Sequence, residues 1–141
     1  MDELIAAYRA TSYRVVDAAG AVLAEARIDK PSPTIDRLLA AHGAGTGVFI
    51  TAWNPRSIVQ ADCLNQAAHD RLVDALGERG LRFLPHVGVG ADPAWSEHGA
   101  FVLELSSGEA LALALAYRQN AIVVVTAGQP AELLLTGLMA G

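Results

Sequence analysis

The stretch LRFLPHVGVGADPAWSEHGAFVLEL, residues 81–105, decides the fold, because it holds two strand patterns and leaves no room for a helix between them. Residues 81–89 alternate imperfectly between apolar and polar side chains, and residues 100–105 form a second apolar run. Parallel neighbouring strands would need a crossover of a dozen or more residues, usually a helix. The loop at residues 92–99 contains Pro93 and is too short for one. The stretch therefore argues against a doubly wound parallel sheet.

The flanking regions continue the alternation of strands and helices. On the carboxyl side, we expect a helix from Ser106 through Tyr117 and a strand at residues 121–126. On the amino side, we expect a strand at about residues 47–52 and a helix that starts between Ser57 and Asp62 and ends near Glu78.

The amino-terminal third predicts a hairpin and a short helix. Residues 2–9 have weak helical spacing, residues 11–16 and 21–28 flank a turn, and a helix begins at Ser32 or Thr34. The sequence thus predicts an α+β fold with a mixed, mainly antiparallel sheet. In it, a ferredoxin-like βαββαβ unit is preceded by a β-hairpin and a helix. The apolar tail, residues 131–141, is expected to pack on the body of the protein or on a second subunit.

The helix after residue 57 has one unusual position. A helical wheel places Leu64, Ala68, Leu72, Ala75 and Leu76 on one apolar face. Asn65 falls inside the same sector.

Composition limits the classes of function. The 141 residues fit a single domain, residues 1–141, and the apolar share of 52% against 18% charged residues favours a large core or an apolar surface for a homo-oligomer. The net charge is −5 and basic residues are scattered, so we expect no nucleic-acid partner. No leader pattern and no run of eighteen apolar residues is present, so we expect no membrane partner and a cytoplasmic location. The single cysteine, Cys63, fits a reducing compartment.

Three segments carry polar side chains that local structure does not require: residues 54–57 together with Asn65, residues 95–98, and residues 118–120. We expect them to converge on one pocket if loops from one edge fold over the sheet. Arg56 would hold an anionic group, the amides would orient a ligand, Trp95 would stack on it, and Glu97 would accept a proton or a hydrogen bond. The candidate ligand-binding residues are Asn54, Arg56, Asn65, Trp95, Glu97 and Gln119.

Each candidate also has a structural interpretation. Asn54 before Pro55 can simply end a strand and start a helix. Asn65 can bond a backbone group of the same loop, and Trp95 can cover the edge of the core.

The chain resembles a bacterial family catalogued as domain of unknown function 3293. The resemblance rests on residues 51–55, Asn65, Gly88, residues 95–97 and residues 118–121, and it extends over about residues 5–126. Leu64 and His98 stand where the family usually has an acidic residue and a serine, so the resemblance supports no role for those two groups here. Because the family has no established activity, it implies a grouping of residues and no reaction.

The sequence contains no pattern that identifies a reaction or a cofactor. Glu97, His98 and His86 are acid and base candidates, but adjacent residues of a strand point to opposite faces. The histidines show no spacing typical of metal ligands, so we expect no metal site. The first interpretation is a binding, interaction or regulatory module without demonstrable catalysis. The alternative is a small-molecule or nucleotide-like ligand-binding protein or enzyme, and whether it is an enzyme stays open.

Overall fold

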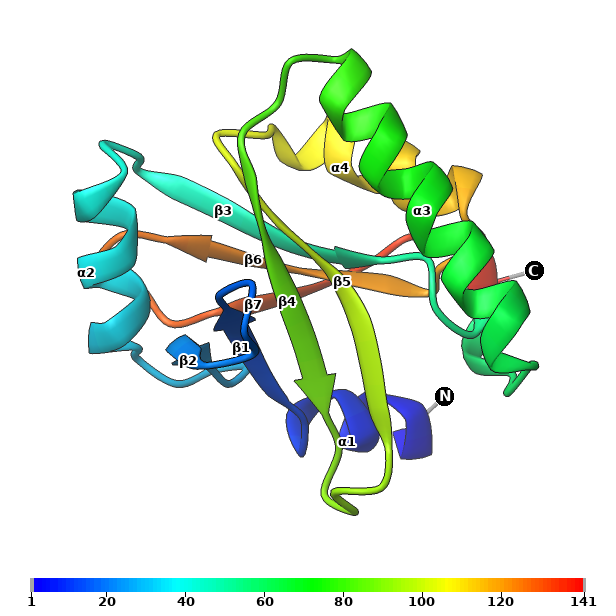
Figure 1. Cartoon of the computed structure of the whole chain (residues 1–141). Helices are drawn as coiled ribbons and strands as arrows, with labels where there is room; N and C mark the ends of the chain where they lie inside the picture. Colours follow the sequence, from blue (N-terminus) through cyan, green and yellow to red (C-terminus); the bar gives the residue numbers. More distant parts are fainter. Residues whose placement is uncertain (1, 141) are drawn as a thin grey trace.

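A computed structural model describes residues 2–140 of the chain (Figure 1). Its helices are four α-helices and two single turns of 3-10 helix. They are α1 (Asp2–Arg9), α2 (Pro33–Ala41), η1 (Pro55–Ser57), α3 (Asp62–Glu78), α4 (Ser107–Ala116) and η2 (Leu138–Ala140). Serine side chains cap two of them, because Ser32 Oγ accepts from the N–H of Ile35 and Ser106 Oγ accepts from that of Glu109.

One antiparallel sheet contains all seven strands, in the order β2-β1-β4-β5-β3-β6-β7. The strands are β1 (Ser12–Val16), β2 (Val22–Ala26), β3 (Thr46–Thr51), β4 (Phe83–Val89), β5 (Ser96–Leu103), β6 (Ala121–Thr126) and β7 (Glu132–Leu135). The α+β class and the mainly antiparallel sheet are confirmed. The ferredoxin-like description of β3 to β6 stays a prediction, since these strands lie within a larger sheet that β1, β2 and β7 extend on both edges.

The sheet curls until its two edges meet at one end. Ile28 forms an isolated bridge to Ala131, and the N–H of Asp29 donates to the carbonyl of Ala131 at 2.8 Å. The sheet therefore has a concave inner face and a convex outer face.

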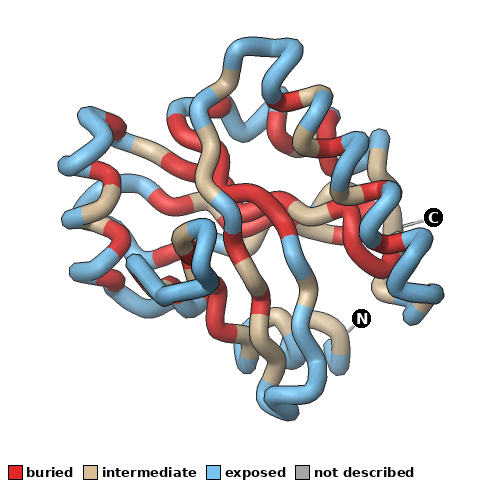
Figure 2. The backbone as a smooth tube through the Cα atoms, viewed as in Figure 1, coloured by how far each residue is buried: buried red, intermediate tan, exposed pale blue. Residues whose placement is uncertain are grey.

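Each face has its own apolar core. On the inner face, α2 buries Ile35 and Leu39 against Phe49 and Phe101. On the outer face, α3 and α4 contribute to one cluster with the strands, in which Leu72 and Leu76 pack with residues of β3 and β5 (Figure 1). Long buried runs lie on the central strands, where residues 47–50 of β3 and residues 99–103 of β5 are all buried (Figure 2). By contrast, α1 buries none of its described residues.

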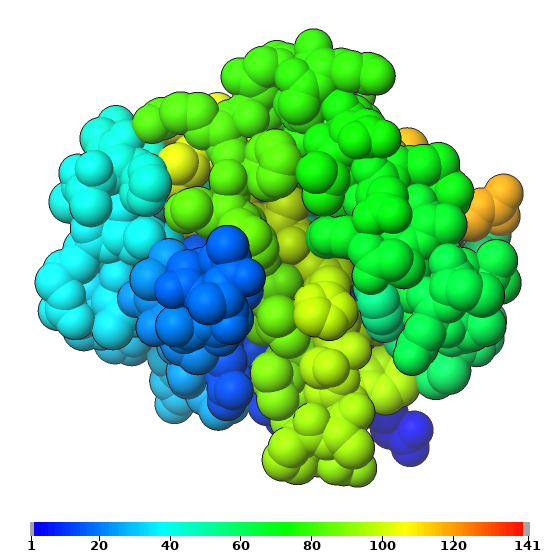
Figure 3. Space-filling model, viewed as in Figure 1, coloured from blue at the N-terminus to red at the C-terminus, as the bar shows by residue number. Residues whose placement is uncertain are grey.

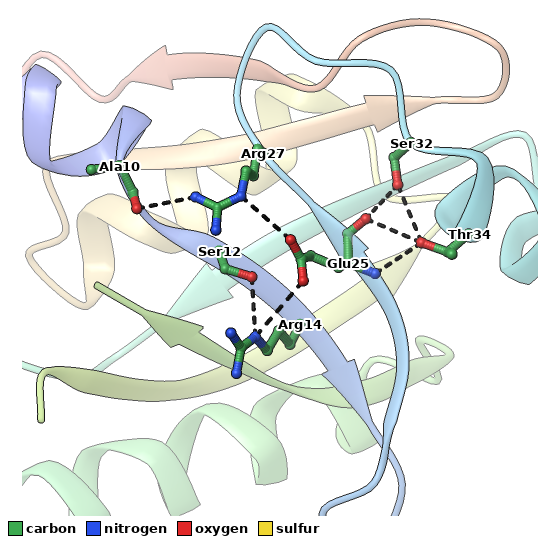
Figure 4. Close-up of polar contacts among 7 residues, drawn as sticks. All are labelled: Ala10, Ser12, Arg14, Glu25, Arg27, Ser32 and Thr34. Carbon is green, nitrogen blue, oxygen red and sulfur yellow. Dashed lines mark hydrogen bonds and ion pairs between the residues drawn. The ribbon is translucent and has the colours of Figure 1, made fainter. Parts of the chain in front are cut away.

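A group of polar contacts fastens the amino-terminal elements to one another (Figure 4). Arg27 donates from Nη1 to the carbonyl of Ala10, just after α1, and its Nε lies 3.4 Å from Glu25 Oε1. The backbone of Glu25 is bonded to the hydroxyl groups of Ser32 and Thr34 at the start of α2. These contacts hold the end of α1 and the start of α2 against β2.

Three details differ from the sequence expectations. Strand β5 begins at Ser96 rather than residue 100, because residues 96–99 pair with β4. The tail forms β7, which pairs with β6 on the body of the protein. Leu64 is 56% exposed and does not join the packed face of α3, on which Asn65 takes its place.

Among residues 2–140, no helix has both the length and the apolar character required to span a membrane.

Candidate functional site

The backbone after β3 is unusually contorted. Asn54, Arg56 and Ser57 adopt positive φ angles of 45°, 58° and 60°, a region that residues with a side chain rarely occupy. The N–H of Arg56 donates to the carbonyl of Arg118 at 2.7 Å, which ties this loop to the end of α4. Strained backbone of this kind persists only where surrounding contacts determine it, and it is common at functional sites.

A network of amide side chains holds Asn54. Its own N–H donates to Asn65 Oδ1 at 2.8 Å, and its Oδ1 accepts from Asn65 Nδ2 at 2.8 Å and from the N–H of Gln60 at 3.2 Å. Its Nδ2 donates to Glu97 Oε2 at 3.1 Å. The expectation that Asn65 bonds a backbone group of the same loop is confirmed, so Asn65 acts as a support behind Asn54.

The third polar segment joins the same region. Gln119 Nε2 donates to the carbonyl of Trp53 at 3.1 Å, and Asn120 Nδ2 donates to Ser57 Oγ at 3.0 Å. The hydroxyls of Ser57 and Tyr8 lie 3.4 Å apart. The loop after β3, the end of α4 and helix α1 therefore meet through side-chain contacts.

A cavity of about 320 Å³ lies where these segments meet, between α1 and the inner face of the sheet. Its wall is mainly apolar and aromatic, and no lysine or arginine of the part of the chain that the structure describes lines it. In the space-filling view, the β4–β5 hairpin covers most of α1 (Figure 3). The lining residues that matter below are Tyr8, Tyr13, Asn54, His86, Gly88, Asp92, Trp95, Glu97 and Gln119.

Glu97 is a largely buried carboxyl group within this wall. It stands on β5 opposite Gly88 of β4, a position that contributes no side chain to the space next to Glu97. Burial raises the pKa of Glu97 to about 7, and the hydrogen bond from Asn54 opposes part of this rise. The carboxyl group is therefore divided between its protonated and ionised forms near neutral pH.

Two aromatic hydroxyls lie near Glu97. Burial is the main cause that raises the pKa of Tyr8, with the Glu97 charge adding to it and the Ser57 hydrogen bond opposing it. Burial also raises the pKa of Tyr13, whose hydroxyl donates to the carbonyl of Tyr8 at 3.4 Å. Both phenols are thus neutral hydrogen-bonding groups at the cavity wall.

His86 forms part of the inner wall and is buried. Its ring packs edge-on against Phe49 with centroids 5.1 Å apart, and Gly99 across the strand leaves room for it. Burial lowers the pKa of His86 to about 3, so the imidazole is neutral, and its Nδ1 has no hydrogen-bond partner within residues 2–140.

The side chains of Glu97 and His98 face different parts of the molecule. Glu97 faces the cavity, whereas the His98 ring packs on Trp53 with centroids 5.1 Å apart. His69 of α3 approaches the same tryptophan at 6.5 Å, and burial lowers its pKa. Across the described part of the chain, no three His, Cys, Asp or Glu residues are grouped so that they could hold a metal ion.

The structure brings together four of the six candidate residues. Asn54, Trp95, Glu97 and Gln119 line the cavity, one or more from each predicted polar segment. Asn65 lies behind the wall, and Arg56 is exposed and not part of the lining.

The sequence did not predict the contribution of the amino-terminal elements to the cavity. Tyr8 of α1 and Tyr13 of β1 belong to its wall. The only signal was the helical spacing of residues 2–9, which places Leu4 and Tyr8 one turn apart on one face.

The part of the chain that matches a known family contains the polar residues of the cavity wall. A family model described as protein of unknown function (DUF3293) matches residues 50–122, slightly more than half of the chain. This range includes Asn54, Glu97 and Gln119 but not α1 or β1, and it is shorter than the resemblance expected from the sequence. Comparison with curated proteins and with solved structures finds no match. The chain belongs to the DUF3293 family of proteins of unknown function.

Proposed function

We propose that this protein binds a small organic molecule in the cavity between α1 and the inner face of the sheet. The observation that carries the proposal is the shared wall: three polar segments far apart in sequence contribute Asn54, Glu97 and Gln119 to one space of about 320 Å³. Ligand sites are commonly concave and mostly apolar, with a few fixed polar groups, and begin at about 300 Å³.

The wall favours a ligand with an apolar or aromatic body and one polar end. Tyr8, Tyr13 and Trp95 offer ring surfaces, while Asn54 and Glu97 offer a donor and an acceptor at one place. A nucleotide or another anionic ligand has less support, since no lysine or arginine among residues 2–140 lines the cavity and Arg56 lies outside it.

Binding has more support than catalysis. The Glu97 carboxyl, with its pKa near 7, could transfer a proton to or from a bound molecule. A nucleophile paired with a base would be needed for covalent chemistry, and Ser57 contacts only Tyr8 and Asn120 among the described side chains.

A fragment screen by ligand-observed NMR would test the proposal. The matched variants are Gly88→Leu, which adds a side chain inside the cavity, and Gly108→Leu, which adds the same side chain at an exposed site on α4. Fragments that bind the wild type and Gly108→Leu but not Gly88→Leu would support the cavity as the site. A library without any hit that Gly88→Leu abolishes would contradict the proposal.

The second candidate function is association with a further copy of the chain. Ile58, Val59 and Leu64 are 65%, 68% and 56% exposed within one short segment, and such apolar clusters are typical of contact surfaces. Sedimentation velocity of the wild type and Val59→Glu would test this function. A concentration-dependent dimer that Val59→Glu dissociates would support it, whereas a strict monomer at all concentrations would contradict it.

A further inference from the structure

We infer that the cavity selects ligands that carry a protonated amine, with the Glu97 carboxylate as the counter-ion and aromatic rings around the cation. This inference rests on the proposed binding function and names the chemical class of the ligand. Four observations support it: the charge of the wall, the unused capacity of Glu97, the fixed orientation of Asn54, and the rings nearby.

The charge of the wall has one sign. Within the described residues 2–140, Glu97 and Asp92 are its only acidic residues, and no lysine or arginine lines the cavity to neutralise them. His86 also lines the cavity, and its imidazole is neutral because burial lowers its pKa to about 3. A carboxylate in a partly buried site without a protein cation is best matched by a cation from the ligand.

Glu97 retains capacity to bind a ligand. Asn54 Nδ2 is the only hydrogen-bond donor to its carboxylate within residues 2–140, and it bonds to Oε2 alone. An ionised carboxylate has about four acceptor positions on its two oxygens. The other oxygen, Oε1, therefore has no protein donor and can accept from an ammonium group.

The orientation of Asn54 is determined by a backbone donor. The N–H of Gln60 donates to Asn54 Oδ1, so this atom must be the oxygen and Nδ2 must face Glu97. Asn65 holds the same arrangement from the other side. Because the amide donates and cannot turn round to accept, it stabilises the ionised carboxylate that a cation requires.

Three aromatic residues share the cavity with Glu97. Tyr8, Tyr13 and Trp95 line the cavity, and a ring face attracts an organic cation within about 6 Å of its centre. Trp95 lies close over Gly90, where an added Cβ would be 3.1 Å from Trp95 Cδ1. The lack of side chains at Gly88 and Gly90 thus lets the rings and the carboxylate face the same volume.

The direction in which affinity changes with pH distinguishes an ammonium ligand from a neutral ligand that binds protonated Glu97. The other ionisable groups that line the cavity with Glu97 are Tyr8 from α1, Tyr13 from β1, His86 from β4 and Asp92 from the loop. In the free protein, the pKa of Glu97 is about 7, and a bound ammonium would lower it, so affinity rises as pH rises through 7. A neutral ligand that accepts a bond from protonated Glu97 would show the opposite dependence.

The test uses three probes of similar shape: 2-phenylethylamine, 2-phenylethanol and 3-phenylpropanoate. Their dissociation constants are measured by NMR titration at pH 8 and pH 5.5 with the wild type, Glu97→Gln and Glu78→Gln. Glu97→Gln keeps an oxygen that can accept from Asn54, and Glu78→Gln removes the same charge from an exposed site outside the cavity.

We expect the amine to bind the wild type at pH 8 about tenfold more tightly than the alcohol, with the carboxylate weakest. Glu97→Gln should remove that advantage and leave alcohol binding within about twofold, while Glu78→Gln should match the wild type. Amine affinity should decrease from pH 8 to pH 5.5 in the wild type and in Glu78→Gln, which both keep Glu97, but not in Glu97→Gln. Matching melting temperatures of the two variants at pH 5.5, where wild-type Glu97 is largely protonated, would show that both are folded.

Equal affinity for amine and alcohol, tighter binding of the carboxylate, or amine binding that Glu97→Gln leaves unchanged would each overturn the inference. If fragments of other classes still bind in the cavity, only the amine selectivity fails. If neither the probes nor the fragment library binds, the proposed function fails and the inference fails with it.

Discussion

Asn54 Nδ2 donates a 3.1 Å hydrogen bond to Glu97 Oε2, although the two residues are 43 positions apart in the sequence. Asn54→Ala would break this bond and leave the N–H of Gln60 without its Asn54 acceptor, while Asn65 Nδ2 would keep only its 3.4 Å bond to the carbonyl of Gln60. Buried donors without partners cost about 1–3 kcal/mol, so we expect a loss of that size in the free energy of unfolding, measured by urea denaturation.

Comparing Asn54→Gly with Asn54→Ala separates the effect of losing the side-chain hydrogen bonds from the cost of the positive φ angle. Asn54 has a φ of 45°, which glycine adopts freely and alanine does not, so Asn54→Gly should be less destabilising than Asn54→Ala by about 1 kcal/mol. Equal stability of the two variants would mean that the positive φ is not maintained in solution.

The pKa of Glu97 predicts a specific dependence of stability on pH. Because the folded-state pKa is raised from 4.5 to about 7, the folded protein holds this proton more tightly than the unfolded chain does. The contribution is fully favourable below pH 4.5 and is lost as pH rises through 7. Allowing for solvent screening of a partly exposed group, the loss is on the order of 1–2 kcal/mol.

Urea denaturation of the wild type and Glu97→Gln at pH 5 and pH 8 would measure this loss as the difference between the two proteins. The difference is needed because His86 acts in the opposite direction: its lowered pKa removes stability as pH falls from 6.5 towards 3. An identical pH dependence in both proteins would contradict a raised pKa for Glu97.

The sequence predicted the elements well where periodicity and turn residues agree. The short Pro93 loop excluded a crossover helix, and β4 and β5 pair as neighbours across it. Strand β7 was not predicted, because a four-residue edge strand is too short to show an alternating pattern. Leu64 was assigned to the packed face because a helical wheel cannot show that Asn65 is needed there to bond Asn54.

The polar half of the cavity could be predicted and the aromatic half could not. Asn54, Glu97 and Gln119 stood out because neither strands nor helices need an amide or a carboxylate at those places. Tyr8 and Tyr13 carry no such signal, since an amphipathic helix and a strand both use tyrosine to cover a core. The pairing of β1 with β4 and of β4 with β5 places Tyr13 and Glu97 on either side of Gly88, and α1, which precedes β1, brings Tyr8 to the same cavity. The periodicity of the sequence does not show this strand order.

Gly99 is expected to tolerate no side chain. An added Cβ would lie 2.3 Å from the carbonyl oxygen of Ile50 and 2.4 Å from His86 Cε1, and neither neighbour can move without disturbing paired strands. Gly99→Ala should lower the free energy of unfolding by about 1–3 kcal/mol or more. Gly45→Ala is the matched control, because an added Cβ there meets nothing within 4 Å. A similar, small effect at both sites would contradict the close approach of β3, β4 and β5.

The carboxyl-terminal segment provides a final prediction that separates its two expected roles. Strand β7 pairs with β6 over four residues, and Ala131 just before it joins the two edges of the sheet. Removal of residues 131–141 should therefore expose the β6 edge and lower the free energy of unfolding by several kcal/mol, on the order of half of the total for a typical domain. Removal of residues 137–141 alone is the matched control, since it leaves β7 intact and should have little effect.

Sedimentation velocity of both truncated chains completes the experiment. If the longer truncation changed the oligomeric state while the unfolding free energy stayed the same, the segment would serve a subunit contact rather than the closure of the sheet.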